Sequence, residues 1–135
     1  LALGTRQPLR FYHLQPQHAR GLAQIEMRDC RNVDIFSMKT EGDVPVLWLQ
    51  DCRNIRIFGV GGIIAPFPGQ PIICMERCDD VLLANVQPQI ATAGRWSALG
   101  IQFDPGRWFI LRDDERQLGA LESFALWLRG DPNGN

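Results

Sequence analysis

Apolar and polar residues alternate along this chain in short segments, and the segments come in pairs joined by a polar turn. Three such pairs share one internal spacing, over residues 25–35, 47–57 and 73–83. Each pair reads apolar-x-apolar, then a turn that holds Cys followed by Asn or Asp, then apolar-x-apolar again. Alternation of this kind is typical of half-buried β-strands, and repetition indicates stacked units.

Alignment of the three copies sorts their residues into columns. Four apolar columns are predicted to point inward and stack: Ile25/Leu47/Ile73, Met27/Leu49/Met75, Val33/Ile55/Val81 and Ile35/Ile57/Leu83. Two columns between them are predicted to face outward: Glu26/Trp48/Cys74 and Arg28/Gln50/Glu76. This arrangement follows from the two-residue period of a β-strand.

The turn contributes two further columns. Cys30, Cys52 and Cys78 occupy one repeat position, and we expect an inward ladder of reduced thiols, because parallel Cα–Cβ vectors suit small buried side chains better than disulfides. Asn32, Asn54 and Asp80 occupy another. Asn tolerates left-handed dihedrals, and its amide can bond to the neighbouring unit, so this column predicts a polar ladder in a tight turn.

The first residue after each turn recurs at spacings of 22 and 26 residues. A weaker fourth copy, over 101–103 and 109–111, adds a spacing of 28, and residues 124–128 suggest a fifth that is cut short. Residues 9–14 fit the later strand of an earlier unit whose first half is missing. Pro and Gly crowd the segments 59–71 and 85–106, which disfavours helices between the copies. The prediction is an all-β, right-handed parallel β-helix of four to five rungs with 22–28 residues per rung.

A leucine-rich repeat uses similar periods, but its final apolar residue lies one position earlier than here. The phrases Arg-Asp-Cys-Arg-Asn-Val-Asp-Ile (28–35) and Gln-Asp-Cys-Arg-Asn-Ile-Arg-Ile (50–57) instead resemble the (N/D)-(S/C)-x-N-(V/I)-x-I rung of the pectate-lyase-like β-helix superfamily. The resemblance covers about residues 9–111. It implies a fold that polysaccharide lyases, glycoside hydrolases, fructotransferases and phage tailspikes share, and it carries no catalytic residue over.

The 135 residues suffice for one domain, and we expect it to belong to a longer protein. Its expected parts are a partial rung (9–14), clear rungs (25–111) and an irregular C-terminal end (112–135). A net charge of −1 gives no electrostatic reason to expect nucleic acid or a membrane surface as partner. No cofactor is expected, and no metal, because the chain has no CxxC pair and His13 and His18 lie outside the repeat.

Rung length grows at one edge of the predicted solenoid. Insertions follow the second strand at 15–23, 59–71 and 85–100, and a shorter connection spans 39–43. In a solenoid such insertions lie on one side and form the walls of a groove.

We expect catalysis or substrate binding in this groove. Glu41 with Asp43 or Asp34 supplies paired carboxylates for polysaccharide cleavage, and His18 is a candidate acid or base. The alternative is that these are solvated turn charges. The candidate substrate-binding residues are Trp48 and Trp96, which offer stacking faces for sugars, and Arg56 and Arg95, which offer cations for a substrate carboxylate.

Two functions remain open. The first is a carbohydrate-active domain of the lyase, hydrolase or fructotransferase type, acting on or binding a polysaccharide and then extracellular or periplasmic. The second is a non-catalytic module for binding, adhesion or assembly. Exposed ends and sides of a solenoid favour self-association, so a homo-oligomer through lateral or end contacts is a further expectation.

Overall fold

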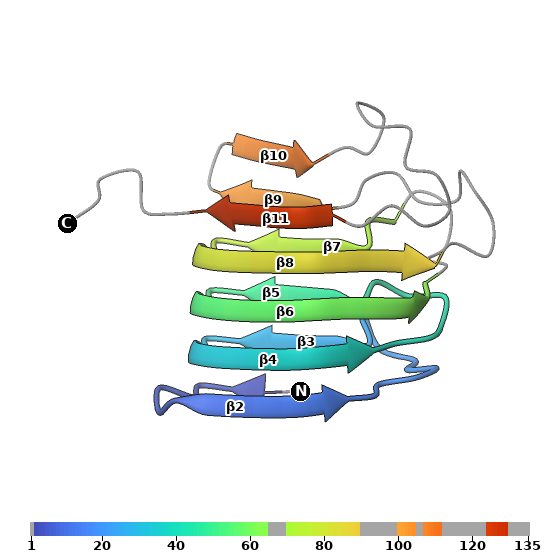
Figure 1. Cartoon of the computed structure of the whole chain (residues 1–135). Coiled ribbons are helices and arrows are strands. Elements are labelled where there is room, and N and C mark those ends of the chain that lie inside the picture. Colours follow the sequence, from blue (N-terminus) through green and yellow to red (C-terminus); the bar gives the residue numbers. More distant parts are fainter. Residues whose placement is uncertain (1, 65–69, 90–99, 105–106, 112–123, 130–135) are drawn as a thin grey trace.

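The computed structural model describes residues 2–64, 70–89, 100–104, 107–111 and 124–129, with side chains described over 4–64 and 70–86. This part of the chain is all-β and forms two facing sheets (Figure 1). Among the described residues there is no helix that is long and apolar enough to cross a membrane.

The chain passes alternately from one sheet to the other. The short-strand sheet contains β1 (Ala2–Leu3), β3 (Ile25–Arg28), β5 (Leu47–Gln50), β7 (Ile73–Glu76) and β9 (Gly100–Asp104), paired in parallel in that order. The long-strand sheet contains β2 (Leu9–Leu14), β4 (Arg31–Lys39), β6 (Arg53–Ile63) and β8 (Asp79–Gln89), also parallel. The predicted parallel β-solenoid is confirmed, with about three turns rather than four to five.

The register of the sheets matches the columns of the repeat. Leu47 pairs with Ile25 on one side and with Ile73 on the other, and Ile55 pairs likewise with Val33 and Val81. The inward columns are buried, except that Ile25 at the first rung is half-buried. Each fully buried Leu or Ile stabilises the fold by about 1.5–3 kcal/mol relative to an exposed one, so every rung depends on its neighbours for stability.

The cysteine column is also inward. Cys30, Cys52 and Cys78 are each at most 1% exposed, and none of them is in a disulfide. The hydrogen bond with Cys52, together with burial, raises the pKa of the Cys78 thiol. These side chains therefore act as small core residues between the two sheets.

The predicted polar ladder is present in the turns. Asn32, Asn54 and Asp80 have left-handed φ angles of 59°, 55° and 52°. The Asn54 amide donates to Asn32 Oδ1 at 2.7 Å. At the third position of the ladder, Asp80 Oδ1 accepts a hydrogen bond from the Arg56 guanidinium at 2.8 Å. The donor to Asp80 is thus a guanidinium, whereas the donor to Asn32 is an amide.

The first rung corrects one expectation. Residues 9–14 do form the later strand of a rung, but its first half is present as β1, where Ala2 pairs with Met27. The Thr5 carbonyl accepts from Arg31 N at 2.8 Å, as the Cys30 carbonyl accepts from Arg53 N at 3.0 Å in the next rung. Thr5 thus holds the place of the column cysteine, which is why the motif is not recognisable there.

The C-terminal strands correct another expectation. The fourth copy begins with a parallel strand, because β9 pairs with β7, but its register is shifted by one residue from the prediction, so that Ile101 pairs with Cys74 and not with Ile73. Its second strand, β10 (Arg107–Leu111), instead pairs antiparallel with β9 in the same sheet. The region expected to be irregular contains β11 (Phe124–Arg129), which pairs antiparallel with β8 and does not start a fifth rung. The fourth copy also lacks the Cys and the Asn or Asp that the other three copies hold in the turn.

The long strands extend further than the alternation predicted. β6 continues to Ile63 and β8 to Gln89, so the first five residues of the predicted insertions 59–71 and 85–100 are strand. Besides the turn residues, each long strand has a residue with positive φ at the same level of the stack: His13, Ser37, Gly59 and Asn85. These bends interrupt the apolar alternation, and the strand continues beyond them.

Candidate functional site

The connections that follow the long strands stack on one another at one edge of the solenoid. Thr40 N–H donates to the Gly61 carbonyl at 2.9 Å, and His18 N–H donates to the Glu41 carbonyl at 2.8 Å. Gly42 N–H donates to the Ile63 carbonyl at 3.2 Å. The parallel ladder therefore continues into the loops, and it fixes the spacing of their side chains.

The side chain of Gln24 ties two of these loops together. Its Oε1 accepts from Ala19 N–H at 3.0 Å, and its Nε2 donates to the Glu41 carbonyl at 3.2 Å. Gly42 has a φ of 148°, and a Cβ atom at this position would overlap the Gln24 amide nitrogen. Neither residue was identified from the sequence, although a glycine between two carboxylates in Glu41-Gly42-Asp43 is a signal of close backbone approach.

A hollow of about 460 Å³ lies between these loops, and we call it the edge hollow. It is lined by His18, Ala19, Arg20, Glu41, Gly42, Asp43 and Ile63. Three of the four residues named from the sequence for catalysis, His18, Glu41 and Asp43, are among them. They come from two neighbouring rungs, as the one-sided placement of the loops predicted.

The Glu41 carboxylate in the edge hollow forms an ion pair with Lys39. Lys39 Nζ lies 2.9 Å from Glu41 Oε1, and the Glu41 side chain is 26% exposed. The hydrogen bond from Lys39 lowers the pKa of Glu41 below its ordinary value of 4.5, and the nearby His18 acts in the same direction. Glu41 is therefore ionised at neutral pH, which suits a hydrogen-bond acceptor or base and does not suit a general acid.

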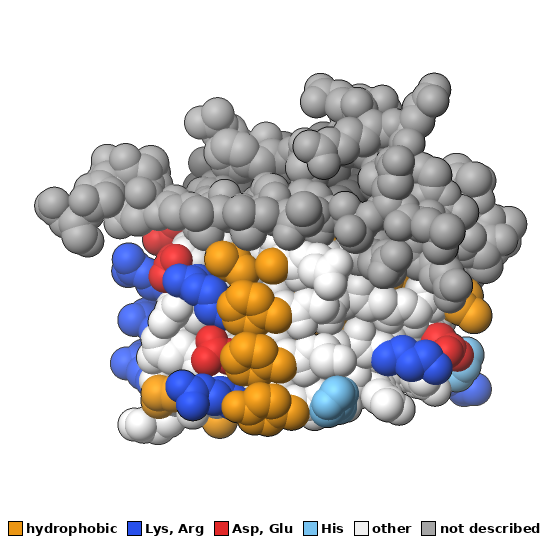
Figure 2. Space-filling model, viewed as in Figure 1, with side chains coloured by type: hydrophobic (Ala, Val, Ile, Leu, Met, Phe, Trp, Pro, Cys, Tyr) orange, Lys and Arg blue, Asp and Glu red, His pale blue; other side chains and the backbone are white. Residues whose placement is uncertain are grey.

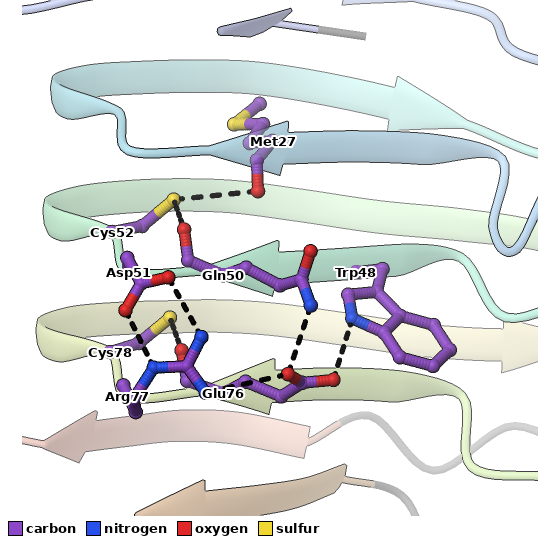
Figure 3. Close-up of polar contacts among 8 residues, drawn as sticks. All are labelled: Met27, Trp48, Gln50, Asp51, Cys52, Glu76, Arg77 and Cys78. Carbon is purple, nitrogen blue, oxygen red and sulfur yellow. Dashed lines mark hydrogen bonds and ion pairs between the residues drawn. The ribbon is translucent and has the colours of Figure 1, made fainter. Parts of the chain in front are cut away.

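Trp48 lies away from the edge hollow, on the outer face of the short-strand sheet (Figure 3). Its indole N–H donates to Glu76 Oε1 at 3.1 Å, while Gln50 Nε2 donates to Glu76 Oε2 at 2.9 Å. Beside them Arg77 makes two hydrogen bonds to Asp51, at 2.7 and 2.8 Å. The carboxylates of this cluster are held by protein donors, so it stabilises the stack of rungs.

Two other residues that the sequence named for binding or catalysis, Arg56 and Asp34, also lie away from the edge hollow. The Arg56 guanidinium donates to the Asp80 carbonyl at 2.7 Å as well as to its carboxylate, on the outer face of the long-strand sheet. Asp34 lies in the same column and accepts from Arg10 at 3.4 Å. Neither Arg56 nor Asp34 lines the edge hollow. Arg95 and Trp96 lie outside the described residues.

A row of aromatic side chains on the long-strand sheet was not identified from the sequence. Tyr12, Phe36 and Phe58 are register neighbours on β2, β4 and β6, and we call them the aromatic strip. Figure 2 shows a hydrophobic band that crosses the stacked strands on this face. The signal was an aromatic residue directly after the last apolar residue of the motif, at Phe11-Tyr12, Ile35-Phe36 and Ile57-Phe58.

Among the described residues, no group of three or more His, Cys, Asp or Glu side chains is arranged to hold a metal ion. Comparison of the chain with protein families, with curated proteins and with solved structures found no match.

Proposed function

We propose that this chain is a polysaccharide-binding module of the β-solenoid type, and that it holds a neutral saccharide in the edge hollow. The observation that carries the proposal is the convergence of His18, Glu41 and Asp43, with Arg20, on one hollow of about 460 Å³. Loops on a rigid scaffold are common binding sites, and stacked backbone hydrogen bonds make these loops part of the scaffold.

The chemistry of the lining suits sugar hydroxyls. Glu41 and Asp43 offer carboxylate oxygens that accept O–H groups, and Arg20 and His18 offer N–H donors. Hydrogen bonds to charged groups are stronger than those between neutral groups, so a few of them suffice to orient a saccharide. The two carboxylates offset Arg20 and Lys39, which leaves no excess positive charge for a uronate.

The ionised Glu41 is suited to accept hydrogen bonds from a saccharide, and it is not suited to the role of general acid. Hydrolysis by two carboxyl groups needs one of them protonated at working pH. Lys39 lowers the pKa of Glu41, so this residue is held in the ionised form. The resemblance of the rungs to pectate-lyase-like proteins supports a polysaccharide partner and does not by itself support their activity.

The test is a binding screen by isothermal titration calorimetry. The probes are hexasaccharides of glucan, mannan, galactan and fructan, with an oligogalacturonate as the charged comparison. Glu41→Gln and Asp43→Asn remove the proposed acceptors, and Asp29→Asn is the matched control, since Asp29 is an exposed carboxylate in the turn at the opposite end of the strands.

We expect at least one neutral hexasaccharide to bind, and we expect Glu41→Gln to weaken it about tenfold while Asp29→Asn leaves it unchanged. Binding by none of the probes, or equal loss in all three variants, contradicts the proposal. Release of shorter products from any probe, assayed in parallel, shows instead a catalytic module of the lyase or hydrolase type.

A further inference from the structure

The aromatic strip is a continuous apolar surface across β2, β4 and β6. The ring centroids of Tyr12 and Phe36 lie 5.2 Å apart, and those of Phe36 and Phe58 are again 5.2 Å apart, with nearly parallel rings. Tyr12 is 64% exposed and Phe58 is 38% exposed. Each ring stabilises its neighbour by stacking, and the exposed parts remain available to a ligand.

A second hollow begins at the edge of the strip. It has a volume of about 430 Å³, and we call it the face hollow. Its lining includes Ser37, Lys39, Phe58, Gly59 and Asn85. It therefore has an aromatic wall on one side, with a hydroxyl, an amide and an ammonium group around it. Gly59, which carries no side chain, leaves its floor open.

The two hollows meet at one ion pair. Lys39 lines the face hollow and Glu41 lines the edge hollow, and their side chains are joined at 2.9 Å. Figure 2 shows the hydrophobic band and, further along the same face, a basic and an acidic side chain in contact, with an uncharged area between. The two hollows are therefore neighbours along one rung.

We propose that the saccharide site extends from the edge hollow into the face hollow, and that the Phe58 ring is a stacking subsite for a second part of the same ligand. The inference rests on the proposed function and names its ligand more closely: a neutral oligosaccharide of pyranose rings. Such a ring has an apolar face of C–H groups and a rim of hydroxyls. The face packs on Phe58, and the rim meets Ser37, Asn85 and Lys39.

A saccharide fits this surface better than a second copy of the chain. Stable protein interfaces bury about 800 Å² on each partner around an apolar centre. Among the described side chains, the strip is a file of three rings that continues to Ala84 on β8, with the paired charges of Arg10 and Asp34 beside it and a hollow with polar groups next to Phe58. A narrow aromatic wall beside hydrogen-bonding groups matches a sugar ring.

The test compares chain lengths and ring variants by calorimetry. The probes are the disaccharide and hexasaccharide of the glucan, mannan and galactan series. Phe58→Leu removes the ring and keeps an apolar side chain, and Phe58→Trp keeps a ring. Tyr12→Ala is the matched control, because it shortens the same strip at a residue that lines neither hollow. Thermal unfolding of each variant checks that it is folded, and light scattering records its oligomeric state.

We expect Phe58→Leu to weaken hexasaccharide binding fivefold to tenfold, as the loss of about one stacking contact implies. Phe58→Trp should bind as the parent chain does, and Tyr12→Ala should bind within twofold of it. Disaccharide binding should be insensitive to Phe58.

If Glu41→Gln weakens hexasaccharide binding and Phe58→Leu does not, the inference is overturned and the proposed function stands. If no probe binds, the proposed function is contradicted, and the inference that rests on it is contradicted with it. A change of oligomeric state in Phe58→Leu assigns the strip to self-association and also overturns the inference.

Discussion

At the scale of single residues, left-handed backbone positions at the turn define each rung. Asn32, Asn54 and Asp80 lie in the left-handed region, where most side chains are strained, and Asn is among the few that tolerate it. The hydrogen bond from Asn54 to Asn32 in the preceding turn then gives the Asn54 side-chain amide a partner. One residue type thus answers both a conformational and a hydrogen-bonding requirement.

This double role can be separated by substitution at Asn54. We expect Asn54→Ala to lower the free energy of unfolding by about 2 kcal/mol, because it loses the hydrogen bond and strains the backbone. Asn54→Gly should cost about 1 kcal/mol, since glycine keeps the dihedral angles and loses only the hydrogen bond. Urea denaturation measures both. Equal losses would show that the backbone conformation contributes nothing.

The Arg77–Asp51 pair predicts a pH dependence of stability. The hydrogen bonds from Arg77 lower the pKa of Asp51 below its ordinary value of 3.8. The pair therefore stabilises the folded chain above that pH, and the contribution disappears as the pH falls through the lowered pKa. Both side chains are largely exposed, so the effect is small.

We expect Arg77→Gln to have a slightly lower urea midpoint than the parent chain at pH 7 and the same midpoint near pH 2. A difference that persists unchanged at low pH would contradict the electrostatic explanation.

At the scale of elements, the long strands depend on glycine where two backbones come close. Gly62 in β6 has a φ of 128°, and a Cβ atom there would overlap the Thr40 carbonyl on β4's side of the stack. Gly59, in the same strand, has a φ of 79°, and its nearest neighbour at ordinary contact distance is Ser37 Cα at 3.8 Å. Glycine is therefore required at position 62 because a side chain would clash with Thr40, and it is favoured at position 59 because of the φ angle alone.

The difference predicts unequal costs for alanine at the two positions. Gly62→Ala should destabilise the chain by about 2–4 kcal/mol, because the backbone at Thr40 in the preceding rung must shift. Gly59→Ala should cost about 1 kcal/mol, which is the strain of a left-handed alanine alone. Thermal or urea unfolding of both variants measures this, and a Gly59→Ala loss as large as that of Gly62→Ala would refute the assignment.

At the scale of the whole molecule, the repeat predicted what depends on period and missed what depends on irregularity. The inward columns, the cysteine column and the Asn ladder follow from alternation and register, so Ile55 and Asn54 are where the sequence placed them. The antiparallel β10 and β11 could not be predicted, because their apolar alternation is the same whichever direction they run.

The candidate site shows the same division. Glu41, Asp43 and His18 were predicted together because solenoid loops gather on one edge. Trp48 and Arg56 were predicted by residue type alone, and the structure gives them partners, Glu76 and Asp80, from the next rung. The role of Gln24 could not be foreseen, because it depends on a contact between loops of adjacent rungs.

The most direct test of polysaccharide binding at the edge hollow is a titration followed by ¹H–¹⁵N NMR of the full chain. The probe is the neutral hexasaccharide with the highest affinity in the calorimetric screen. We predict saturable shift changes in the backbone amides of His18, Gly42 and Ile63, and unchanged amides around Trp48 on the opposite sheet. Shifts confined to the short-strand sheet, with the amides of the edge hollow unmoved, would contradict the account.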